Sequence, residues 1–106
     1  MSFDLAVWNS EFSEAERRAT AIYETLCRGG HCADLLPSPH VAQFHSDLLA
    51  MWPESDAIKI NHSDRHILIS CEWSKAEEVY IFVRELAKTH KLVFFDPQSE
   101  EVVLPE

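Results

Sequence analysis

The stretch RHILISCEWSKAEEVYIFVREL, residues 65–86, decides the fold because it changes from a strand pattern to a helix pattern. Its first half, residues 65–73, is a strand-like run rich in β-branched and aromatic residues. The residues expected on the buried face are Ile67, Ile69, Cys71 and Trp73. Ser74 and Glu77 then form a capping-box pair that predicts a helix start. Apolar residues follow at helical spacing, at Val79, Phe82, Val83 and Leu86, which predicts a helix reaching about His90.

A second strand is predicted directly before this stretch. Residues 57–61 form another strand-like run, and the polar turn His62-Ser63-Asp64 joins it to the run at 65–73. Two strand-like runs joined by a short polar turn are typical of an antiparallel hairpin. The centre of the chain is therefore expected to form a hairpin followed by a helix.

The N-terminal half predicts one strand and two helices. The segment Phe3–Trp8 alternates and is expected to be a strand. The capping-box pair Ser13 and Glu16 predicts a first helix that stops before the glycine pair at 29–30. Ser38 as N-cap and Pro39 at the first helical position predict a second helix, ended by Pro53. Its expected buried face is Val41, Phe44, Leu48 and either Met51 or Trp52.

The C-terminal residues complete the predicted sheet. Residues 92–95 are an almost wholly apolar strand, 96–99 have turn chemistry, and 101–104 predict an edge strand. We therefore expect a single α+β domain over residues 1–106. It has one sheet of four to five strands with three helices on one face, in a split βαβ (ferredoxin-like) layout with an extra helix in the first crossover.

The charge of the chain limits the partners that it can bind. Eighteen Asp and Glu against nine Lys and Arg give a formal charge of -9. This charge repels phosphate backbones and anionic lipid headgroups, so neither nucleic acid nor a membrane is an expected partner. A basic protein is attracted by the same field. The first residues carry no leader pattern, and three cysteines are an odd number, so we expect a cytoplasmic protein with reduced thiols.

One local cluster favours a different interpretation. Cys27, His31 and Cys32 could supply three soft ligands to a zinc ion, although the Cys-x4-Cys spacing is unusual and only His40 or His45 could provide a fourth ligand. The sequence contains no phosphate-binding glycine loop, nucleophile elbow or His-Glu-x-x-His motif. We therefore expect neither catalysis nor a cofactor. A small metal-binding protein or enzyme that uses the loop of these three residues is the alternative.

Four motifs make the chain resemble a family of small bacterial proteins. They are the opening Phe3–Trp8 (FDLAVW), the helix start at Pro37-Ser38-Pro39, the segment 48–53 ending in Trp-Pro, and the closing Phe-Asp-Pro-Gln at 95–98, which follows a helix end at 87–90. Some members of this family look like immunity proteins, which neutralise a toxin domain in the cytosol by occluding its active site. The resemblance implies this role, but it carries over no catalytic residue.

The expected function is thus a binding protein, an immunity protein for a basic toxin domain. The predicted contacts combine large aromatic, imidazole and acidic side chains, which suit a basic cleft. They are Trp52, His62, Asp64, Glu72, Asp96 and Glu100. A homo-oligomer formed by pairing of the edge strand at 101–104 is a further possibility.

Overall fold

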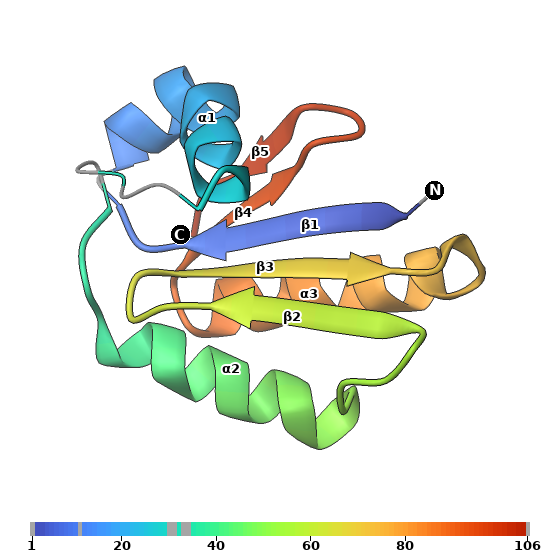
Figure 1. Cartoon of the computed structure of the whole chain (residues 1–106). Helices are drawn as coiled ribbons and strands as arrows, with labels where there is room; N and C mark the ends of the chain where they lie inside the picture. The colour runs from blue at the N-terminus through green and yellow to red at the C-terminus, as the bar shows by residue number, and fades with distance from the viewer. Residues whose placement is uncertain (1, 11, 30–31, 33–34, 106) are drawn as a thin grey trace.

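The central strand of the sheet is the first strand of the chain. In the computed structural model, which describes residues 2–10, 12–29, 32 and 35–105 and only the backbone of 12–16, β1 (Phe3–Trp8) lies between β3 (His66–Cys71) and β4 (Val93–Asp96). The sheet order is β2-β3-β1-β4-β5, with β2 (Ile58–His62) and β5 (Glu101–Val103) at the edges (Figure 1).

Every pair of neighbouring strands is antiparallel. Strand β3 therefore separates β1 from β2, which run parallel to each other, and this is the split βαβ arrangement. The predicted α+β class, the single sheet and the hairpin are confirmed.

The predicted placement of three helices on one face is wrong. Helices α2 (Pro39–Met51) and α3 (Ala76–Thr89) pack on the face that carries Leu5, Val7 and Phe94. Helix α1 (Phe12–Cys27) packs on the opposite face, against Trp8 and Phe95. Figure 1 shows α3 behind the strands, with α1 at the other side of the sheet. Because β1 and β4 are apolar on both sides, each face needs a cover.

Helix α2 begins as the sequence predicts. The Ser38 side chain accepts a hydrogen bond from the His40 backbone N–H at 3.1 Å, and Pro39 opens the helix. Its buried residues are Val41, Phe44 and Leu48. At its end, Met51 is exposed, while Trp52 is partly buried against the core. Both predicted ends of the helix are thus confirmed.

Helix α3 begins in a different way from the prediction. A 3-10 turn, η1 (Trp73–Lys75), precedes it, and the residue before its first turn is Lys75, which makes no side-chain cap hydrogen bond. The Ser74 hydroxyl donates instead to a Glu72 carboxylate oxygen at 3.5 Å. The capping box of Ser74 and Glu77 does not form, because the 3-10 turn shifts the helix start past Ser74. The equivalent side chains of α1, Ser13 and Glu16, lie outside the described residues.

Candidate functional site

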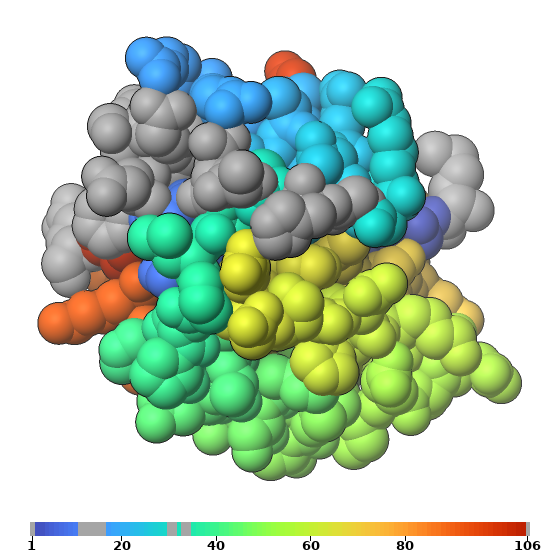
Figure 2. All heavy atoms as spheres, turned by 60° about the vertical axis from the view of Figure 1, so that its left-hand side comes forward, coloured from blue at the N-terminus to red at the C-terminus, as the bar shows by residue number. Residues whose placement is uncertain are grey.

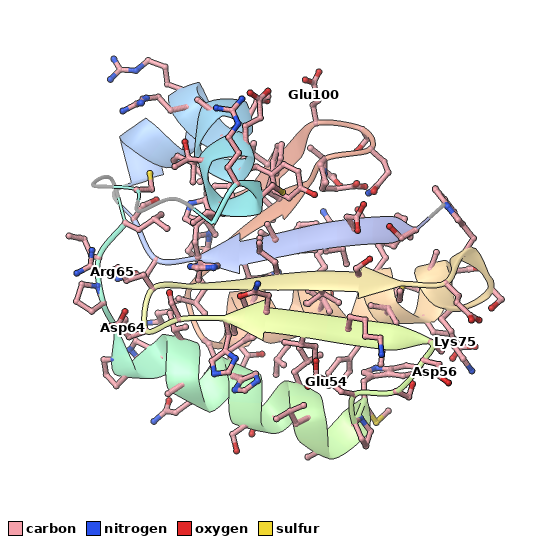
Figure 3. All side chains as sticks on the ribbon, in the orientation of Figure 1. Glu54, Asp56, Asp64, Arg65, Lys75 and Glu100 are labelled. Carbon is pink, nitrogen blue, oxygen red and sulfur yellow. The ribbon has the colours of Figure 1, made fainter. Side chains whose placement is uncertain are left out.

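The six predicted contact residues do not form one surface. His62 and Asp64 lie at the turn of the β2–β3 hairpin, and Glu72 lies at the opposite end of β3. Glu100 lies beyond β4, next to α1, in a hollow that Arg17, Thr20 and Glu24 also line. Figure 3 shows Asp64 and Glu100 far apart on the ribbon. A single partner of ordinary interface size would contact only part of this set.

Asp96, another predicted contact residue, is buried in the β4–β5 turn. It is 7 % exposed, and its carboxylate accepts hydrogen bonds from the Gln98 backbone N–H at 3.0 Å, the Gln98 Nε2 at 2.6 Å and the Ser99 hydroxyl at 3.1 Å. Gln98 in turn donates to the Asp4 carbonyl oxygen at 2.7 Å and accepts from the Asp4 N–H at 2.8 Å. Asp96 therefore fixes the β4–β5 turn onto the start of β1, which is a structural role.

Trp52 lies at the C-terminal end of α2. Its indole is partly buried and packs against the core between the sheet, α2 and α3. Within the described part of the chain, the Nε1 of Trp52 is buried without a hydrogen-bond partner. Its backbone N–H ends α2 by donating to the Leu48 carbonyl at 2.7 Å. Trp52 therefore stabilises the C-terminal end of α2.

Trp73 is the exposed aromatic residue that the sequence prediction missed. We expected it on the buried face of the strand, but it lies in η1 and is 50 % exposed. Its ring is nevertheless held in place, because it packs edge-on against Phe3 with ring centroids 5.2 Å apart. The polar residues on both sides of it, Glu72 and Ser74, are the signal in the sequence that the buried strand has already ended.

Four exposed carboxylates lie at the same end of the sheet as Trp73. Glu72 precedes it, Glu77 and Glu78 occupy the first turn of α3, and Asp56 lies in the segment that leads into β2. The Glu72 N–H donates to the Ala57 carbonyl at 2.9 Å, which ties that segment to the end of β3. We call Asp56, Glu72, Trp73, Glu77 and Glu78 the Trp73 surface.

The positive charges near the Trp73 surface are few. Lys59 approaches Asp56 at 3.9 Å, and both side chains are largely exposed. Lys75 lies at the same end of the molecule as Asp56 (Figure 3). Among the described residues, Glu72, Glu77 and Glu78 make no ion pair. Acidic residues in a first helical turn also favour the helix by themselves, because they face its positive end. The surface is negative and open to solvent.

The hairpin turn carries a second group of predicted residues. Asp64 is exposed and lies 3.6 Å from Arg65, and His62 is exposed and stacks on His45 of α2 with centroids 3.8 Å apart. His66 bonds through Nδ1 to the Ser63 hydroxyl at 2.8 Å. Burial, together with the nearby His62, lowers the pKa of both His45 and His66. Imidazoles from α2, β2 and β3 therefore gather around this turn.

The alternative metal site lies only partly within the described residues. Cys27 is exposed at the end of α1 and Cys32 is buried, whereas His31 lies outside the described residues. Over 2–10, 17–29, 32 and 35–105, no group of three or more His, Cys, Asp or Glu side chains is arranged to hold a metal ion.

Across the described helices, none is long and apolar enough to cross a membrane.

No family model, no curated protein and no solved structure matches this chain. The function must therefore be inferred from the chain's own surface and charge.

Proposed function

We propose that this chain is a cytosolic, non-enzymatic binding protein that acts as an immunity protein, neutralising a bacterial toxin domain by covering its active site. The observation that carries the proposal is Trp73, a half-exposed indole held against Phe3 at an end of the sheet that also carries exposed carboxylates. Tryptophan is enriched among the residues that contribute most to interface affinity. A ring already fixed in the free protein loses little conformational freedom on binding.

The charge of the chain supports a basic partner. The formal charge is -9, and the Trp73 surface has four carboxylates that extend into solvent. Toxin domains that act on nucleic acid need a positive cleft to bind phosphates, and such a cleft is complementary to this surface. Opposite charges accelerate association at low ionic strength, and buried anchors slow dissociation. The indole supplies the anchor and the carboxylates supply the steering.

The experiment begins with the purified chain as bait in a lysate of the source organism, at low and at high salt. A captured protein is identified by mass spectrometry and expressed in a host with and without this chain. We expect growth arrest by the captured protein alone and growth when the chain is present. A captured protein that arrests growth equally in both cases, or that is not toxic, would overturn the immunity function.

A direct assay then separates occlusion from other kinds of inhibition. The purified toxin is assayed with a substrate small enough to diffuse into its cleft and with its full-sized substrate. Occlusion predicts that the chain abolishes turnover of the large substrate and competes with it for binding. Inhibition that is noncompetitive toward the full-sized substrate would contradict occlusion, even if the two proteins bind tightly.

A further inference from the structure

Helix α2 and the β2–β3 hairpin meet through two imidazoles. The rings of His45 and His62 stack with centroids 3.8 Å apart and planes 25° from parallel. Nearby, the Ser38 N–H donates to the Asp64 carbonyl at 3.1 Å, which ties the start of α2 to the hairpin turn. In Figure 2 the side chains of α2 and of the hairpin form one continuous surface. The imidazole stack is part of the contact that joins the helix to the edge of the sheet.

Charged and titratable groups face this stack from each element around it. Glu54, in the segment after α2, acts on His45 and favours its charged form. Asp64 in the turn acts in the same direction on His66 of β3, and Asp64 also pairs with Arg65 at 3.6 Å. His62 opposes both carboxylates, since a charge on it disfavours a charge on His45 and on His66. A proton on His62 therefore disfavours a second proton on His45 of α2 or on His66 of β3.

We infer that the His45–His62 stack is a proton-sensitive contact, which holds α2 against the hairpin while the imidazoles are neutral and loosens when both are protonated. Two neutral rings at this separation gain from stacking and from the apolar area that they cover. Two cationic rings at the same separation repel. The inference does not depend on the proposed function.

The direction of the effect follows from the protonation states. Burial, and then His62, lowers the pKa of His45 below its ordinary value of 6.5, and the same two causes lower that of His66. The open or unfolded chain therefore binds more protons than the closed one near and below that pH. The stability that the closed contact gives is complete above pH 6.5 and is lost as the pH falls below it.

The test is an NMR titration of the histidine ring protons, with amide hydrogen exchange measured from pH 7 to pH 5 and corrected for intrinsic rates. We expect protection of β2 and of α2 to fall several-fold over this range, because the open chain binds more protons than the closed one as the pH falls. His62→Phe keeps a ring for stacking and removes the charge. It should reduce the pH dependence of that protection and raise the pKa of His45 part of the way toward its ordinary value, because burial still lowers it.

The controls make the result specific to the stack. His40→Gln removes an exposed histidine from the same helix and should leave the pH dependence as in the unmodified chain. His62→Asn removes both ring and charge, and it serves if the phenylalanine variant fails to fold. It should weaken protection at pH 7 and flatten the pH dependence. An unchanged His45 pKa in both His62 variants, or an equal loss of protection with and without His62, would overturn the inference.

Discussion

The Trp73 indole lies edge-on against the Phe3 ring, with planes 64° apart, and it joins the start of α3 to the first strand of the sheet. Phe3 is 7 % exposed and belongs to the core, whereas half of Trp73 faces solvent. Phe3 is thus a core residue, and its ring holds the Trp73 ring in a partly exposed position. This relationship separates the effects that substitutions of Trp73 should have on binding and on folding.

Trp73→Ala should weaken binding of the captured partner by about 2 kcal/mol or more, roughly thirtyfold in Kd, because the anchor is lost. The free energy of unfolding should fall less, since half of the ring is already exposed. Titration calorimetry and urea unfolding measure the two quantities. Leu36→Ala is the matched control, because Leu36 is 46 % exposed but lies outside the Trp73 surface. Equal loss of affinity in both variants would contradict an anchor at Trp73.

Glu72→Lys should slow association with a basic partner several-fold at low salt, and the difference should shrink as salt is added. Glu72 borders Trp73, whereas Glu100 faces α1 on another side of the molecule. The same reversal at Glu100 should therefore leave association nearly unchanged apart from the smaller net charge. Stopped-flow mixing at several salt concentrations gives the rates. If the two reversals slow association equally, net charge alone and no particular surface steers the encounter.

Asp96→Ala should lower the free energy of unfolding by about 2 kcal/mol, because three donors lose their shared acceptor in the β4–β5 turn. Asp96→Asn keeps one acceptor oxygen and should cost less. Asp56→Ala is the control, because that carboxylate is fully exposed and lies 3.9 Å from Lys59. Urea unfolding at neutral pH measures all three. A neutral effect of Asp96→Ala would show that these hydrogen bonds do not hold the turn.

The sequence predicts the elements well because their signals are local. The Ser38-Pro39 start of α2, the polar hairpin turn and the strand after α3 each depend on neighbouring residues alone. The position of α1 depends on which strands lie beside β1, and that is not a local property. Even so, the segment 92–95 has no polar position, and Trp8 follows Val7 in β1. Such strands need apolar cover on both faces.

The candidate site was less predictable from sequence than the fold. The sequence around a tryptophan at the end of a strand reads the same whether its side chain is buried or exposed. Trp73 is exposed because it lies in the 3-10 turn that follows the strand. Asp96 looks like any acidic residue of a turn until Gln98 and Ser99 are seen to donate to it. The stack of His45 on His62 joins residues seventeen positions apart and has no signature in the chain.

Tyr80→Phe should change the behaviour of the protein at alkaline pH. The Tyr80 hydroxyl donates to a Glu101 carboxylate oxygen at 2.5 Å and so fastens α3 to the edge strand β5. This hydrogen bond, and then burial, raises the pKa of Tyr80 above its ordinary value of 10. The folded chain therefore holds the phenolic proton more tightly than the unfolded chain, and the stability it gives is complete below pH 10 and lost as the pH rises through the raised pKa.

The substitution should accordingly lower the free energy of unfolding by about 1 kcal/mol at neutral pH. The difference between the variant and the unmodified chain should shrink as the pH rises above 10, because the unmodified chain then loses the same hydrogen bond. Denaturant unfolding from pH 7 to pH 11 measures this difference, which also cancels the titration of other groups. Arg84→Ala is the control, since Arg84 approaches the same Glu101 carboxylate at 4.0 Å as an exposed ion pair and should contribute little. A difference that stays constant with pH would mean that the phenolic proton does not hold β5 in place.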